Sequence, residues 1–165
     1  AEWSRKSCGD EIPIIWAGGI WDRGDIDMAL SHGAKGVQMA SRFICTHECD
    51  AADSFKQAFI NAKEGDVVII DSPAGLPGRA LNTPFSKQLL HGTEAPEQKC
   101  FASCLQECLY RDQDDAFCIF GALHSAQQGD MKNGLVFTGT NATRHNRMMS
   151  VKELFEELQA GRDAD

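Results

Sequence analysis

The chain has 165 residues, of which 42% are hydrophobic, and it carries a formal net charge of −8. This acidic balance argues against nucleic-acid binding, which requires clustered Lys and Arg. No apolar run is long enough to span a bilayer, and residues 1–10 lack the apolar segment of a signal peptide. Seven cysteines form no evident even disulfide framework, which indicates a reducing compartment. We therefore expect a cytoplasmic protein with neither nucleic-acid nor membrane partners.

The first predicted element is a strand at residues 12–17, because its continuous apolar run is typical of a strand buried on both faces. A glycine pair at 18–19 follows and lets backbone N–H groups approach a ligand closely. The next helix is predicted between Asp22, its N-cap, and Gly33, its left-handed C-cap. Another strand is predicted at residues 36–40. This order forms a βαβ crossover and predicts parallel strand pairing.

The glycine turn leads into a helix N-terminus. Such a terminus offers unpaired N–H donors and the positive end of a helix dipole, both of which suit a phosphate. A glycine pair is equally typical of a simple tight turn. The local motif by itself leaves both interpretations open.

Four sequence blocks, taken in order, resemble the nitronate monooxygenase family, formerly called 2-nitropropane dioxygenases. That family includes flavin-dependent enoyl-acyl-carrier-protein reductases. The blocks are residues 12–20 (IPIIWAGGI), 33–43 (GAKGVQMASRF), 72–80 (SPAGLPGRA), and 134–139 (GLVFTG) followed by 150–154 (SVKEL). The resemblance covers nearly the whole chain. It implies an FMN-dependent TIM barrel that oxidises alkyl nitronates, small-molecule substrates, with O2. The alternatives are an enoyl-thioester reductase and a non-catalytic phosphate-binding half-barrel.

The resemblance also implies which residues hold the FMN phosphate at two strand ends. They are Ala17, Gly18 and Gly19 on one side, and Gln38, Met39, Ala40 and Ser41 on the other. The family has Gly-Thr where Ala40-Ser41 stands. Ser41 keeps a hydroxyl donor, whereas Ala40 restricts the backbone. The family's His proton acceptor belongs to earlier barrel strands, so we assign no catalytic residue to this chain.

Length adds a constraint, because a TIM barrel typically needs about 250 residues. We therefore expect an α/β chain that forms the C-terminal portion of a TIM (β/α)8 barrel. The last two strand–helix units are predicted at 1–66, a strand, Pro/Gly-rich loop and linker at 67–98, and a mainly helical appendage at 99–165. Such a portion leaves open strand edges. We expect a missing N-terminal barrel segment or a partner chain to cover them, and a homo-oligomer is open as well.

The middle of the chain alternates between regular and irregular segments. A helix is predicted at 53–62, with Asp50 or Asp53 as its cap, and a strand at 67–70. Two prolines and two glycines in residues 72–80 predict a fixed irregular loop. Its Arg79 either has a role at the active site, where it binds an acidic substrate or closes over the flavin, or a structural role, in which it caps nearby carbonyl groups or pairs with a carboxylate. A further helix is predicted at 85–90.

Cys100, Cys104, Cys108 and Cys118 follow the spacing C-x3-C-x3-C-x9-C. Thiolates in such a group hold zinc or an iron–sulfur cluster in other proteins. A helix over 100–109 would separate the Cα atoms of Cys100 and Cys108 by about 12 Å, which is too far for one metal. The apolar pattern favours this helix, with buried thiols along one face. We assign no metal ligand, and the cluster stays an alternative.

The last third of the chain is predicted to contain two more helices. One spans 116–128, and the other spans 151–158, with Ser150 and Glu153 forming a capping box. An extended loop is predicted at 134–141, and its position relative to the flavin is open. The basic cluster at 144–147 is predicted to be a solvated loop.

Overall fold

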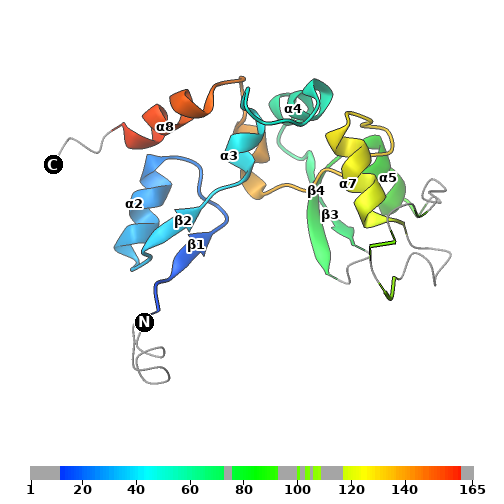
Figure 1. Cartoon of the computed structure of the whole chain (residues 1–165), viewed down its shortest axis with the longest axis horizontal. Coiled ribbons are helices and arrows are strands. Elements are labelled where there is room, and N and C mark those ends of the chain that lie inside the picture. The colour runs from blue at the N-terminus through cyan, green and yellow to red at the C-terminus, as the bar shows by residue number, and fades with distance from the viewer. Residues whose placement is uncertain are drawn as a thin grey trace.

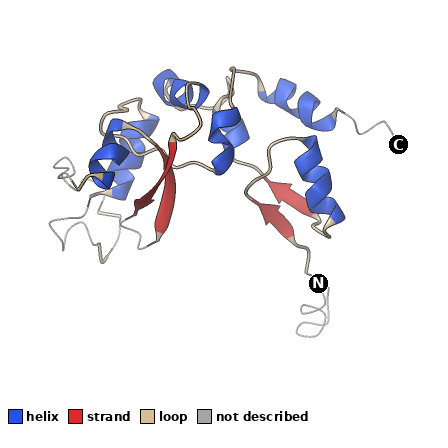
Figure 2. Cartoon of the chain, turned by 180° about the vertical axis from the view of Figure 1, so that it is seen from behind, coloured by secondary structure: helices blue, strands red, loops and turns tan. Residues whose placement is uncertain are grey.

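The computed structural model describes residues 12–72, 76–92, 100, 103–104, 106–108 and 117–160. Figures 1 and 2 show two lobes: one holds β1, β2 and α2, and the other holds β3, β4, α5 and α7. The elements in chain order are β1 (Ile15–Ala17), α2 (Arg23–Ser31), β2 (Gly36–Gln38), α3 (Ser41–Ile44), α4 (Asp53–Ile60), β3 (Val67–Asp71), β4 (Pro77–Leu81), α5 (Pro84–Leu90), α7 (Ile119–Gln127), the 3-10 helix η1 (Thr140–Arg144) and α8 (Val151–Gln159).

The predicted βαβ crossover is confirmed at the start of the described chain. Strands β1 and β2 pair in parallel, with Ile15 opposite Gly36. Helix α2 begins after Asp22, whose side chain accepts a hydrogen bond from the backbone N–H of Asp25 in a capping box. Gly33, with φ of +93°, follows the last turn of the helix, where a left-handed residue ends it. Local signals therefore determine this unit.

Strand β1 is exposed, so the prediction that it is buried on both faces is wrong. The exposed fractions of Ile14, Ile15 and Trp16 are 51%, 55% and 38%. Within the described residues β1 pairs only with β2, and no second layer covers its outer face. A strand in a two-stranded sheet lacks the neighbours that bury a parallel strand. The described residues therefore leave its apolar run uncovered.

Residues 77–81 form strand β4, so the prediction of an irregular loop over 72–80 is wrong for this part. Strand β4 pairs antiparallel with β3, from Val67 opposite Leu81 to Asp71 opposite Pro77. A proline at the first position of a strand at a sheet edge removes no essential ladder bond. Gly78 is needed because an added Cβ would lie 2.5 Å from the ring of Phe137. Both residues therefore belong to a strand.

The other predicted helices form, with two corrections. Helix α4 begins after Ala52, which provides no side-chain cap, so the prediction of Asp50 or Asp53 as the cap is wrong. Helix α7 begins at Ile119, and the Sγ atom of Cys118 accepts from the N–H of Gly121. Helix α8 has the predicted capping box of Ser150 and Glu153. Among the helices that the structure describes, none is long and apolar enough to cross a membrane.

The cysteine segment differs from the predicted helix with buried thiols. The described residues between 100 and 108 are not helical, and Cys100 and Cys104 are exposed. Cys118 is buried at the start of α7. The other residues of this segment lie outside the described ranges. Among the described residues, no three His, Cys, Asp or Glu side chains gather as metal ligands would. The cluster therefore stays an open alternative.

The core joins segments that are far apart in sequence. One cluster of buried residues, the central core, comprises Cys45, Phe59, Leu81, Ala126, Val136 and Ala142. Leu154 and Leu158 of α8 pack with Met149 against Ile26 and Phe43. The predicted boundaries at 66/67 and 98/99 stay predictions, but the C-terminal helix packs on the first strand–helix unit.

Candidate functional site

A pocket of about 150 Å³ lies at the carboxyl ends of β1 and β2. The topology explains its place, because ligands bind outside the carboxyl ends of parallel strands. Three segments line it: Ala17, Gly18, Gly19, Ile20 and Trp21; Gln38, Met39, Ala40 and Ser41; and Gly139, Thr140 and Asn141. All seven residues predicted to bind the cofactor therefore line one pocket. That they bind a phosphate stays a prediction.

The turn after β1 has its carbonyl groups engaged and its N–H groups available. Gly18 and Gly19 adopt φ of +88° and +76°. The indole Nε1 of Trp16 donates to the carbonyl oxygen of Gly18 at 3.2 Å, and the amide Nδ2 of Asn141 donates to that of Gly19 at 3.0 Å. In the part of the chain that the structure describes, the N–H groups of residues 18–20 donate to no other residue. The turn thus presents hydrogen-bond donors.

Carboxylates already accept from several N–H groups at the start of α2. The Asp25 carboxylate accepts from the N–H of Trp21 at 2.8 Å, and Asp22 Oδ1 accepts from the N–H of Asp25 at 3.1 Å. The N–H of Asp25 and the guanidinium of Arg144 lower the pKa of Asp22. Asp22 and Asp25 therefore cap this end of the helix, and a phosphate contact with it stays a prediction. The turn at residues 18–20 offers backbone donors without such a cap.

The second wall of the pocket carries a hydroxyl group. Ser41 begins α3. Its Oγ would lie 3.6 Å from a Cβ added at Gly139. The hydroxyl therefore lies beside the third wall. Ala40 has a φ of −122°, which is outside the left-handed region that favours glycine. The backbone at this position therefore does not require the glycine that the family has.

The third wall, Gly139 to Asn141, belongs to the loop at 134–141, whose position relative to the flavin the sequence left open. It begins the 3-10 helix η1, which returns to the pocket from the C-terminal part of the chain. Hydrogen bonds hold it there: Asn141 to Gly19, and His145 Nε2 to the carbonyl oxygen of Ser41 at 2.8 Å. The sequence offered one signal for this wall, the resemblance of residues 134–139 to the family. That resemblance does not specify which residues the segment contacts.

The prediction of a solvated loop for the basic cluster at 144–147 holds for Arg144, Asn146 and Arg147, which are exposed, but not for His145. His145 is 6% exposed, and its ring lies 4.7 Å from that of Trp21. Burial lowers the pKa of His145, and so does the charge of Arg42. Arg144 pairs with Asp22 at 2.7 Å, and its Cζ lies 5.2 Å from the centre of the Trp21 ring. The cluster thus anchors the segment that closes the pocket.

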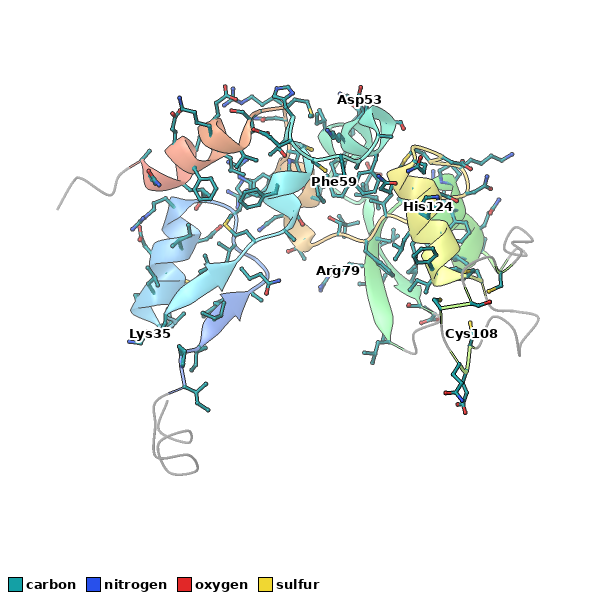
Figure 3. The ribbon with its side chains drawn as sticks, viewed as in Figure 1. Lys35, Asp53, Phe59, Arg79, Cys108 and His124 are labelled. Atoms are coloured by element: carbon teal, nitrogen blue, oxygen red, sulfur yellow. The ribbon has the colours of Figure 1, made fainter. Side chains whose placement is uncertain are left out.

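Arg79 lies on β4, next to the chain that leads to the third wall. The N–H of Thr138 donates to its carbonyl oxygen at 3.0 Å. Figure 3 shows its side chain extending from β4 into the space between the two lobes. Arg79 forms no ion pair with any described residue. The predicted pairing with a neighbouring carboxylate is therefore not found in the described part of the chain. No described residue matches the family's proton acceptor.

The family model described as nitronate monooxygenase matches residues 6–161. The chain therefore belongs to the nitronate monooxygenase family.

Curated relatives match about half of the chain. A probable nitronate monooxygenase of Staphylococcus aureus (strain Newman) is 36% identical over 78 residues, which are 47% of this chain and 22% of the relative. A (3aS,4S,5R,7aS)-5-hydroxy-7a-methyl-1-oxo-octahydro-1H-indene-4-carboxyl-CoA dehydrogenase of Mycobacterium tuberculosis is 34% identical over 98 residues, which are 59% of this chain and 27% of the relative. The chain spans about a quarter of the length of such relatives.

Solved structures show the same α/β fold. FabK from Thermotoga maritima is 28% identical with a TM-score of 0.68, and the match covers 94% of this chain and 45% of that one. A nitroalkane oxidase from Streptomyces ansochromogenes is 21% identical with a TM-score of 0.63, and covers 92% of this chain and 39% of that one. The second likeness supports the fold alone.

Proposed function

We propose that the protein containing this chain is an FMN-dependent oxidoreductase that oxidises alkyl nitronates with O2. This chain supplies its FMN-phosphate site. The observation that carries the proposal is the turn at residues 18–20, whose carbonyl groups at 18 and 19 accept from side chains while its N–H groups are available. An anion requires donors and is repelled by carbonyl oxygens, so this turn suits a phosphate.

The residues present fit a phosphate group. An added Cβ at Gly18 or Gly19 would meet no atom within 4 Å, so the space beside the turn is open to a ligand. The pocket holds about 150 Å³, whereas pockets for drug-sized ligands hold about 300–1,000 Å³. A pocket of this size would hold the phosphate end of FMN rather than the whole cofactor.

The chain's own residues bind and orient the cofactor. Residues 18–20 donate backbone N–H groups, and Ser41 donates its hydroxyl from the opposite wall. Arg144 offsets the charges of Asp22 and Asp25, which reduces the local repulsion of an anion. When bound, FMN accepts and passes on the electrons of the oxidation. We assign the proton acceptor to a part of the protein beyond this chain.

The fold supports a further proposal about the rest of the protein. We place this chain as the last two strand–helix units of a TIM barrel, followed by a helical appendage. The exposed Ile14 and Ile15 of β1 then pack against barrel strands supplied by a missing N-terminal segment or a partner chain. A cytoplasmic location and a homo-oligomeric assembly belong to the same proposal.

A second function, reduction of an enoyl thioester, is favoured by Arg79. Acyl carriers such as coenzyme A bear phosphate groups, and a guanidinium binds phosphate with two parallel hydrogen bonds. The similarity to a carboxyl-CoA dehydrogenase and to FabK also supports this alternative. A nitronate has no phosphate for Arg79 to bind.

The test begins with the visible absorption spectrum of the native protein that contains this chain. Two flavin bands, with FMN released on denaturation, are the expected result. Oxygen uptake with an alkyl nitronate then supports the first function, whereas oxidation of NADPH that depends on an enoyl-CoA supports the second. A colourless protein that takes up no FMN refutes both functions and leaves a non-catalytic phosphate-binding half-barrel.

A further inference from the structure

The segment that closes the pocket is held independently of any ligand. Ala142 of η1 is fully buried in the central core. Arg144 pairs with Asp22, and His145 donates to the carbonyl oxygen of Ser41. Asn141 contacts Gly19, so four of the five positions from 141 to 145 fix η1 relative to both strand ends. The amide of Asn141 therefore reaches the turn from a rigid support.

The turn itself lacks such rigidity. Gly18 and Gly19 both have positive φ, and glycine has the widest freedom in its backbone angles. The peptide plane between residues 19 and 20 rotates about ψ of Gly19 and φ of Ile20, so Gly19 removes the resistance to rotation on one side of this plane. If it rotates, a carbonyl oxygen takes the place of an N–H group, because the two point in opposite directions across a trans peptide. An external donor to the Gly19 oxygen opposes this rotation.

We propose that Asn141 is a positioning residue that holds the turn in the orientation that binds a phosphate monoester. The proposal rests on the proposed FMN site and adds a residue that the family resemblance did not assign. Asn141 acts through the carbonyl group of Gly19, from a segment 122 residues away in the chain. Trp16 makes the equivalent bond to Gly18 from an exposed position, without the support of a buried helix.

The test compares FMN with riboflavin, which differs only by the phosphate. The flavin-free form of the native protein is titrated with each, and flavin fluorescence gives the two Kd values. In Asn141→Ala we expect the Kd for FMN to rise about tenfold. Without Asn141 the turn loses one charge-assisted hydrogen bond from its N–H groups to the phosphate. The Kd for riboflavin is expected to stay within about twofold of the original protein, since only the phosphate contacts change.

Two further variants sharpen the result. Asn141→Leu keeps the approximate shape of the side chain and removes the donor without adding a charge, so we expect it to lose about as much FMN affinity as Asn141→Ala. It also decides the matter should the alanine variant not fold. The matched control is Asn146→Ala, at an exposed position of the same segment, which should leave both Kd values unchanged.

Two results overturn the role of Asn141. One is an unchanged Kd for FMN in both variants. The other is an equal loss of FMN and riboflavin, which indicates a structural role only. A different result overturns the proposed function: an original protein that binds riboflavin as tightly as FMN has no phosphate site. The Asn141 variants therefore test the positioning role, and the original protein tests the proposed function. The same set of titrations distinguishes the two failures.

Discussion

Substitution of Gly19 by aspartate tests the phosphate site directly. The structure leaves room for the new side chain, because no atom lies within 4 Å of an added Cβ. Its carboxylate would lie beside the N–H groups that we assign to the phosphate. Gly33→Asp is the matched control: Gly33 also has a positive φ and open space at the Cβ position, but it does not line the pocket.

The expected loss follows from the two charges. A carboxylate about 5 Å from a phosphate of charge about −1.75, at an effective dielectric constant of about 20, is repelled by about 6 kcal/mol. Full screening by water, with a dielectric constant of about 80, leaves about 1.5 kcal/mol. Even the lower value raises the Kd for FMN by about tenfold. Both variants also carry the strain of an L-residue at positive φ, of about 1–2 kcal/mol.

The assay measures flavin content and stability for each variant of the native protein. We expect Gly19→Asp to be purified without FMN, and Gly33→Asp to keep the flavin spectrum of the original protein. The thermal unfolding midpoints of the flavin-free variants should be similar, because the backbone strain is similar. FMN retained by Gly19→Asp at its original Kd would refute the phosphate assignment, and equal flavin loss in both variants would show that strain, not charge, is responsible.

Three further predictions concern packing, protonation and substrate choice. Gly134→Ala should lower the free energy of unfolding by about 1–3 kcal/mol in denaturant titrations, because its Cβ would lie 2.6 Å from the Cα of Ala126, whereas Gly24→Ala should not destabilise. The pKa of His145 lies below its ordinary value of 6.5, so stability is full above that pH and falls as the pH drops below it; His145→Gln should flatten this fall, and an unchanged pH profile of unfolding would contradict the assignment. Arg79→Ala should raise the KM for an enoyl-CoA on the order of tenfold and leave kcat unchanged, if the protein reduces thioesters. Equal KM values in steady-state kinetics would remove Arg79 from substrate binding.

Several elements were predictable because their signals are local. Asp22 and Asp25 form a capping box within one turn, and Gly33 ends the same helix. The capping box of Ser150 and Glu153 is another local pattern. Such contacts span three residues, so the sequence contains both partners side by side. The parallel pairing of β1 and β2 followed from the short crossover between them.

Strand β4 was missed because its stability is not local. Pro77 and Gly78 disfavour a strand in sequence, yet the ladder with β3 and the ring of Phe137 hold them in one. The exposure of β1 was also unpredictable, because an apolar run shows that a surface requires a cover but not which segment supplies it. Both outcomes depend on neighbours that lie elsewhere in the chain or beyond it.

The sequence by itself determined the family, the βαβ unit and the seven residues at its strand ends. Only the tertiary structure showed that these seven lie together and that η1 closes their pocket. Three hydrogen bonds close the pocket, and the two residues in each are between 104 and 122 positions apart in the chain. They join Asn141 to Gly19, Arg144 to Asp22, and His145 to Ser41. No local pattern specifies such partners, because they meet only after the central core has formed around Ala142.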